Sequence, residues 1–232
     1  MKNRKILPYE KKVFSQNLED GIIELLVSNL KDPNRISIEI GSGNGSQNML
    51  RNLIENLGYK GIGHDLNAPR WFHENYTHIT GIISLSTLDS LVKTWPTLIP
   101  DFFSLDIDSF DFWILKKLLK NLNFRPSIIC VEYLCYYGPT KLVSAKPNLE
   151  NYPLCNCGAS LGLYKKFLHD QGYRFFTCDT FGINAFFYLE EKITDISKYE
   201  TNEWAFYRKY KKFVNGIENN DNLEFDYQTL LG

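Results

Sequence analysis

The sequence predicts an α/β fold in which helices cover both faces of a mostly parallel β-sheet. Short apolar segments of strand length alternate along the chain with segments whose apolar residues repeat at helical spacing. The predicted strands that precede helices are apolar on both faces, as strands in the middle of a parallel sheet are. The first of them, residues 36–40, runs directly into a turn rich in glycine, which is typical of a strand-to-helix connection.

Length, composition and charge set limits on the function. The 232 residues suit one such domain with an added segment, and the net charge of −1 gives no reason to expect a broad nucleic-acid surface. No apolar run of about 18 residues occurs, so we expect no membrane span. The basic start of the chain lacks the apolar core of an export signal, which predicts a cytoplasmic protein with reduced cysteines. Cys155 and Cys157 have the wrong spacing for a zinc pair.

The elements of the first half follow from apolar periodicity. The predicted helices cover 12–30, 46–57 and 86–93, and the predicted strands cover 36–40, 59–66 and 77–83. Ser15 is a candidate N-cap of the first helix, and residues 86–89 resemble a capping sequence. The second helix should end at Gly58, because glycine readily adopts the left-handed conformation that closes helices. Residues 68–75 are expected to form a loop or a short helix.

The second half continues the alternation and then departs from it. The predicted elements are a strand at 102–107, a helix at 110–122, a strand at 127–132, a helix to about 171 capped near Ser160, and a hairpin of strands 172–178 and 183–189. Residues 133–158 show no period, and a connection of this length is usually functional. We therefore expect one domain over 1–192, with a helical N-terminal cap (1–34) and an insert (133–158) that covers the substrate, followed by a partly helical tail (193–232).

The glycine turn holds the first group of candidate binding residues. Glycine permits positive φ and lets a ligand approach the backbone closely, and the helix that follows offers free N–H groups. The third glycine lies two positions after the second, whereas dinucleotide-binding turns place it three positions on. We expect the following residues to bind a nucleotide cofactor: Glu39, Gly41, Ser42, Gly43, Asn44 and Gly45.

A second group lies at the ends of the next two predicted strands. Asp65 follows the glycine turn by about twenty residues, the position from which a carboxylate binds the ribose hydroxyls in nucleotide-binding folds. A solvated aspartate at a strand end is the alternative interpretation. Leu66 and Ile82, beside these strand ends, are further candidates for contact with the cofactor.

Carboxylates gather at the ends of predicted strands 102–107 and 127–132. Asp106, Asp108 and Glu132 should meet at one edge of the sheet, where they repel one another unless a cation or a proton is present. Asp106 is expected under the cofactor and Asp108 is a candidate general base, while the three together form a candidate Mg²⁺ site. Asp111 is better explained as an acid in the first turn of a helix.

With these residues in place, the chain resembles the FkbM-like family of class I S-adenosylmethionine (SAM) methyltransferases over residues 14–189. The resemblance rests on six motifs in order: Phe14 to Gln16 with Glu19 to Gly21, Glu39 to Gly45, Ser104 to Trp113, Val131 to Tyr133, Gly158 to Leu161, and Gly182 to Phe187. It implies a Rossmann-like seven-stranded sheet with an antiparallel last strand and SAM as methyl donor. It also implies that the segment with Ser15 and Gln16 closes over the cofactor.

The same resemblance implies O-methylation of a small molecule, most often a sugar or another secondary metabolite. A sugar or sugar nucleotide of cell-surface polysaccharide or natural-product biosynthesis is therefore the expected acceptor, and a homodimer is compatible with the sequence. A phosphorylated metabolite is a further expected acceptor, with the methyl group going to a hydroxyl or to a phosphate or phosphoramidate oxygen. His64 and Asn67 depart from the residues usual in such families, without removing the ribose carboxylate. Two other functions stay open: an NAD(P)-dependent oxidoreductase, and a non-catalytic protein with the SAM-binding fold.

Overall fold

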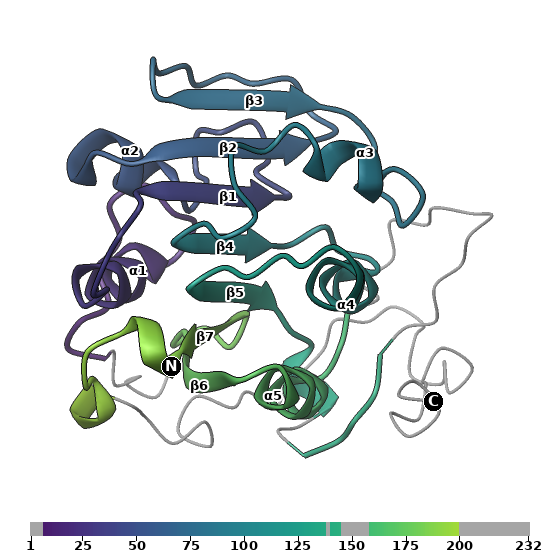
Figure 1. Ribbon diagram of the computed structural model, residues 1–232. Helices are drawn as coiled ribbons and strands as arrows, with labels where there is room; N and C mark the ends of the chain where they lie inside the picture. Colours follow the sequence, from purple (N-terminus) through teal and green to yellow (C-terminus); the bar gives the residue numbers. More distant parts are fainter. Residues whose placement is uncertain (1–6, 138–139, 145–157, 200–232) are drawn as a thin grey trace.

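The computed structural model describes residues 7–137, 140–144 and 158–199. Within these ranges the chain forms a seven-stranded sheet with the strand order β3-β2-β1-β4-β5-β7-β6 (Figure 1). The strands are β1 (Ile36–Ile40), β2 (Lys60–Asp65), β3 (Tyr76–Thr80), β4 (Phe102–Leu105), β5 (Ile128–Glu132), β6 (Tyr173–Cys178) and β7 (Asn184–Leu189).

The first five strands are parallel, and β7 runs antiparallel to both of its neighbours, β5 and β6. This order confirms the predicted sheet of the class I methyltransferase fold. From β1 the chain continues to β2 and β3 on one side of the sheet, and from β4 it continues to β5 on the other side. The strand order therefore reverses between β1 and β4. In an open α/β sheet, such a switch point at the carboxyl ends of the strands is where ligands bind.

Helices cover both faces of the sheet, as predicted. The helices are α1 (Glu19–Ser28), α2 (Arg51–Leu57), α3 (Leu88–Val92), α4 (Asp111–Asn121) and α5 (Leu161–Asp170). Apolar residues of α1 and α2 form one core with one face of the strands, and those of α3, α4 and α5 form a second core with the other face. Neighbouring strand residues such as Phe102 and Phe103 point into opposite cores, which explains why the strands are apolar throughout.

The prediction of a helix over 12–30 was wrong in its first third. Of the predicted helical cap over 1–34, the structure describes residues 7–34, and the helix within them is α1. Residues 11–18 form an irregular segment because the Asp20 carboxylate accepts hydrogen bonds from the backbone N–H groups of residues 13, 14 and 15. Ser15 is not the N-cap, which is Leu18. The Ser15 hydroxyl instead donates to Asp20. Polar side chains that bond nearby N–H groups compete with helix formation in this way.

The helix after the glycine turn also begins later than predicted, at Arg51 rather than at 46, and it has seven residues. Asn44 Oδ1 accepts from the Ser46 N–H, and Asn48 Oδ1 accepts from the Arg51 N–H, so the side chains hold the intervening residues in turns. The predicted end is confirmed, because Gly58 closes α2 in the left-handed conformation with φ +71°.

Residues 66–75 form a loop without a helix. In α5 the predicted cap is confirmed, because the Ser160 hydroxyl accepts from the Leu163 N–H. The predicted insert is described only in part: a short 3₁₀ helix covers Cys135–Tyr137, and Ser144 bridges to Ala159. Cys155, Cys157 and the tail beyond 199 lie outside the described residues. Residues 193–199 contain the 3₁₀ helix Ser197–Tyr199 and an isolated bridge from Ile193 to Leu30.

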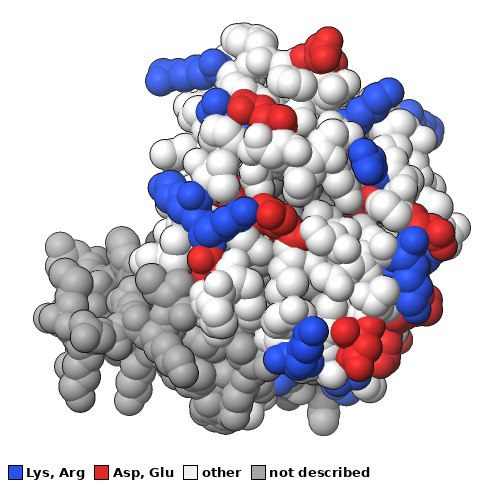
Figure 2. All heavy atoms as spheres, turned by 90° about the vertical axis from the view of Figure 1, so that its left-hand side faces the viewer, with Lys and Arg blue, Asp and Glu red and all other residues white. Residues whose placement is uncertain are grey.

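Charges of both signs are mixed on the surface at the amino ends of the parallel strands (Figure 2). This mixture agrees with the net charge of −1. Among the residues that the structure describes, no helix is long and apolar enough to cross a membrane.

Candidate cofactor pocket

The glycine turn brings the ends of β1 and β4 into direct contact. Gly41 has φ +88°, and its N–H donates to the His64 carbonyl at 2.8 Å. A Cβ at this position would lie 1.5 Å from the Asp106 carbonyl oxygen, so no side chain fits. Gly43 also has positive φ, but a Cβ there would meet no heavy atom within 4 Å. The turn therefore packs tightly at Gly41 and opens to free space at Gly43.

Asp65 lies at the end of β2, as predicted, and ties that end to the glycine turn. Its Oδ2 accepts from the Gly43 N–H at 2.7 Å, and its Oδ1 accepts from the backbone and side-chain N–H groups of Asn67 at 2.8 and 2.7 Å. Asn67 thus orients the carboxylate. Each carboxylate oxygen can accept more than one hydrogen bond, so Oδ2 retains capacity for a ligand hydroxyl.

A pocket of ≈ 640 Å³ lies against the glycine turn at the carboxyl ends of the strands. Its lining contains most of the residues predicted from the sequence: Gln16, Glu39, Gly41, Ser42, Gly43, Asn44 and Asp106. Gly45, Asp65, Leu66 and Ile82 are outside the lining. Leu66 and Ile82 are 57% and 61% exposed, and other large apolar side chains such as Phe72 and Ile99 are exposed too.

The pocket also recruits residues that the sequence reasoning did not select: Glu19, Ser46, Gln47, Asn48, Met49, Asn67, Ala68, Pro69, Arg70 and Asn184. Glu19 Oε1 accepts from Asn184 Nδ2 at 3.1 Å, although the two residues are 165 positions apart. Both belong to quoted sequence motifs, but only the antiparallel placement of β7 beside β5 brings Asn184 opposite Glu132. The tertiary pairing, rather than any local pattern, creates this part of the site.

Glu39 is a buried acid in the pocket wall. Its Oε1 accepts from the Met49 N–H at 3.2 Å, whereas Oε2 has no hydrogen-bond partner among the described residues. Burial is the main cause that raises the pKa of Glu39 to about 8, and repulsion from Asp106 and Asp65 adds to it. Glu39 therefore holds a proton at neutral pH unless a positive group enters the pocket.

The raised pKa predicts a specific dependence of stability on pH. The folded chain keeps the Glu39 proton up to pH about 8, whereas the unfolded chain loses it near 4.5. The contribution of Glu39 is thus most favourable below 4.5 and declines as the pH rises through that window. We expect the unfolding free energy of the wild type to fall between pH 5 and pH 8. The fall in Glu39→Gln should be smaller by on the order of a few kcal/mol, because glutamine does not titrate. Denaturant unfolding at both pH values measures this difference.

The matched control is Glu191→Gln, which changes an exposed glutamate outside the pocket lining. It should follow the wild-type pH dependence. A Glu39→Gln variant with the full wild-type slope would contradict the assignment of a bound proton to Glu39.

Asp106, Asp108 and Glu132 meet as predicted, with one ligand oxygen from each lying within 4.8 Å of the others. Burial and repulsion from neighbouring acids raise the pKa of both Asp106 and Glu132, which are hydrogen-bonded to each other. Both shifts favour a proton within the pair when no cation is present. Asp108 is exposed and has φ +54°, a left-handed conformation that a tight turn imposes.

Asp111 confirms its predicted structural role in the first turn of α4. Its two carboxylate oxygens accept from the backbone N–H groups of Ile107 and Ser109, at 2.8 and 3.0 Å. These bonds fix the loop that carries Asp108. Burial raises the pKa of Asp111, and the two backbone bonds oppose that shift.

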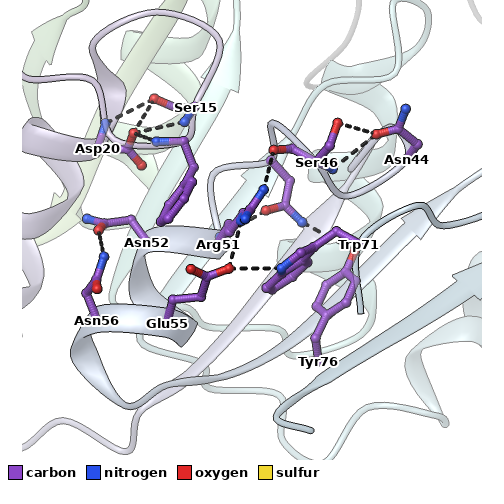
Figure 3. A network of polar contacts seen from close by, with 12 residues as sticks. Ser15, Asp20, Asn44, Ser46, Arg51, Asn52, Glu55, Asn56, Trp71 and Tyr76 are labelled. Atoms are coloured by element: carbon purple, nitrogen blue, oxygen red, sulfur yellow. Dashed lines mark hydrogen bonds and ion pairs between the residues drawn. The ribbon is translucent and has the colours of Figure 1, made fainter. Parts of the chain in front are cut away.

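The N-terminal segment, residues 7–18, lies beside this pocket and contributes Gln16 to its lining. Asp20 holds the segment through the bonds from residues 13–15 (Figure 3). Glu10 attaches it to the turn between β6 and β7, because Glu10 Oε1 accepts from the Thr180 N–H at 2.7 Å. The segment is thus anchored both to α1 and to the turn between β6 and β7.

Comparison with known proteins adds little beyond the fold. No protein family matches the chain, and no curated protein does. The FkbM-like resemblance is therefore not confirmed and stays a prediction.

Several solved structures are similar to this chain. Three of them are the small RNA methyltransferase HEN1 (15% identity, TM-score 0.43), human N-acetylserotonin methyltransferase in complex with SAM (13%, 0.40), and a cyclopropane-fatty-acyl-phospholipid synthase-like protein from Lactobacillus casei (14%, 0.41). The similarity covers 84%, 66% and 70% of this chain, and 28%, 46% and 73% of the other chains. The chain thus spans less than half of the length of the first two.

Proposed function

We propose that this chain is a SAM-dependent methyltransferase. The observation that carries the proposal is the charge of the pocket at the switch point between β1 and β4. Three acids line it, Glu19, Glu39 and Asp106, whereas Arg70 is the one cationic side chain among its described lining residues. SAM carries a sulfonium and an ammonium group. A cation in the pocket would offset the cost of burying ionised acids and would reduce the repulsion between them.

The same charges argue against a dinucleotide. The pyrophosphate of NAD(P) is anionic and is normally held at the N-terminus of the helix after the glycine turn. Here α2 begins six residues after Gly45 (51 − 45). The Met49 N–H, which precedes α2, already donates to Glu39. A pyrophosphate, unlike a cation, would not offset the burial and mutual repulsion that raise the pKa of Glu39 and Asp106.

The predicted binding residues fit SAM in a definite direction. Asp65, oriented by Asn67, would bind the ribose hydroxyls, and the exposed pair Leu66 and Ile82 would contact the adenine. Glu39 and Asp106 would face the methionine part, where the positive charges lie. A bound SAM would cover the exposed side chains of Leu66 and Ile82. It would also place positive charge beside the buried carboxyl groups of Glu39 and Asp106, whose burial costs free energy when they are ionised and unpaired.

The cluster of Asp108, Asp106 and Glu132 supplies the chemistry for methylation of a hydroxyl. SAM supplies an electrophilic methyl group when bound, and the acceptor oxygen must lose its proton. Asp108 is the exposed member of the cluster and can accept that proton, while the protonated pair of Asp106 and Glu132 keeps the local negative charge low. We propose a small hydroxyl-bearing acceptor, such as a sugar or sugar nucleotide of polysaccharide or natural-product biosynthesis.

A divalent ion is the second way to activate the acceptor at this cluster. Asp106, Asp108 and Glu132 would hold the ion through the carboxylate oxygens that Mg²⁺ prefers, and the ion would supply positive charge beside the acceptor oxygen. The buried hydroxyl of Tyr164 has no hydrogen-bond partner among the described residues and interacts electrostatically with Asp111, Glu132 and Asp106.

Two measurements test the proposed function. Calorimetry should show that the chain binds SAM and does not bind NAD or NADP, and the reverse order would contradict it. Release of S-adenosylhomocysteine should then be followed with panels of free sugars, sugar nucleotides and other hydroxyl compounds. Each panel is run with EDTA and again with excess Mg²⁺, so that loss of turnover in EDTA and its recovery with Mg²⁺ identify a metal requirement.

A further inference from the structure

We propose that Arg51 is a positioning residue that joins two walls of the pocket and thereby slows release of the cofactor. The first wall is the N-terminal segment, residues 7–18, and the second is the β2–β3 loop, residues 66–75. This inference rests on the proposed function, since it assigns a role in holding SAM.

The Arg51 side chain contacts both walls at once. Its guanidinium carbon lies 4.2 Å from the ring centroid of Phe14, in the N-terminal segment, and 5.4 Å from the ring of Trp71, in the loop. Both distances are within the range of cation–π attraction. Figure 3 shows Arg51 directed toward Ser46 and Trp71 from its position in α2.

Hydrogen bonds fix the guanidinium in this position. Arg51 Nε donates to Glu55 Oε1 at 2.8 Å, and Arg51 Nη1 donates to the Ser46 carbonyl at 3.1 Å. The indole N–H of Trp71 donates to the same Glu55 oxygen at 2.9 Å (Figure 3). Glu55 thus links Arg51 to Trp71 and balances the charge, which leaves the guanidinium faces for the aromatic rings.

Neighbours of both rings line the pocket, although Arg51 itself does not. Gln16 follows Phe14 by two residues, and Arg70 immediately precedes Trp71. Trp71 is further held by Tyr76 of β3, with the ring centroids 4.6 Å apart. Tyr76 therefore holds the loop against the sheet, and Arg51 connects the loop to the N-terminal segment through its contacts with Trp71 and Phe14.

Loss of Arg51 should loosen the segment without unfolding it. Asp20 holds residues 13–15 and Glu10 holds the turn at Thr180, and neither set of bonds involves Arg51. Phe14 would lose its cationic partner between these anchor points. Because Gln16 lies on the pocket wall, this wall would open more often, and a bound ligand would leave faster.

The experiment measures how fast S-adenosylhomocysteine dissociates from the wild type and from two variants, by stopped-flow displacement with excess SAM. For Arg51→Ala we expect dissociation to be about 3- to 30-fold faster, the factor that corresponds to a cation–π contribution. Phe14→Leu keeps an apolar side chain but removes the ring, and it should give a similar increase. Hydrogen exchange of the amides of residues 13–16 should become faster in both variants.

The matched control is Arg125→Ala. Arg125 lies 5.0 Å from the Tyr173 ring at the amino end of β5, far from the pocket lining, so its loss also removes a cation–π contact. Its dissociation rate should equal that of the wild type. Equal rates for wild type and both pocket-wall variants would overturn the role of Arg51, whereas failure of the wild type to bind either compound would overturn the proposed function and, with it, this role.

Discussion

Replacing Asp108 with asparagine is expected to lower methyl transfer by about 10²- to 10⁴-fold, the usual contribution of a general base. SAM binding should stay within a few-fold of the wild type, because Asp108 does not line the cofactor pocket. Asparagine is suited to this test, since it tolerates the left-handed conformation that Asp108 adopts with φ +54°. The backbone of the turn should therefore be preserved.

Turnover is measured as S-adenosylhomocysteine release at saturating SAM, and binding is measured by calorimetry. Asp195→Asn changes an exposed aspartate far along the chain and serves as the control for loss of a carboxylate. Near-normal turnover in Asp108→Asn would show that another group accepts the proton. If Mg²⁺ is required, the variant should also need a higher Mg²⁺ concentration, because one of the three oxygen ligands is altered.

Gly41→Ala is expected to have the largest effect on stability. The new methyl group would lie 1.5 Å from the Asp106 carbonyl oxygen and 2.5 Å from its carbonyl carbon, so backbone must move. The residue would also have to adopt φ +88°. We expect the unfolding free energy to fall by roughly 3 kcal/mol or more, because strain of about 1–2 kcal/mol adds to the clash.

Gly43→Ala separates the two causes. Gly43 also has positive φ, at +57°, but its added Cβ would meet nothing within 4 Å. It should lose only about 1 kcal/mol, the cost of the left-handed conformation alone. Denaturant unfolding of both variants measures the difference, and equal losses would contradict the contact of Gly41 with β4. Weakened SAM binding by a stable Gly43→Ala would indicate that the ligand occupies the open space beside Gly43.

Most of the sheet could be predicted from the sequence because its signals are local. Unbroken apolar runs identify the central strands, and a serine followed by an apolar helix identifies the cap at Ser160. The two helix starts were misplaced because bonds from polar side chains to nearby backbone N–H groups override the helical pattern of the apolar residues. The Asp20 carboxylate accepts hydrogen bonds from the N–H groups of residues 13–15. The Asn48 side chain accepts from the Arg51 N–H, which holds the preceding residues in turns.

The candidate site divides in the same way. Acids at strand ends were found because parallel strands bring their carboxyl ends to one edge, which places Asp106, Asp108 and Glu132 together. Glu19 and Asn184 were missed because their contact joins α1 to the start of β7. Arg51 was missed because its role depends on two aromatic rings in different loops. A periodic pattern carries no information about such pairings.

The position of β7 between β5 and β6 has a consequence for the order in which the pocket is completed. The strand that covers the edge of β5 is the last strand among the described residues, so this edge lacks its partner until residues 184–189 have been synthesised. Asn184, at the start of that strand, also completes the acidic end of the pocket with Glu19. A nascent chain that stops short of β7 would therefore expose an apolar edge prone to aggregation, and it would lack the finished pocket whose ligand would stabilise it.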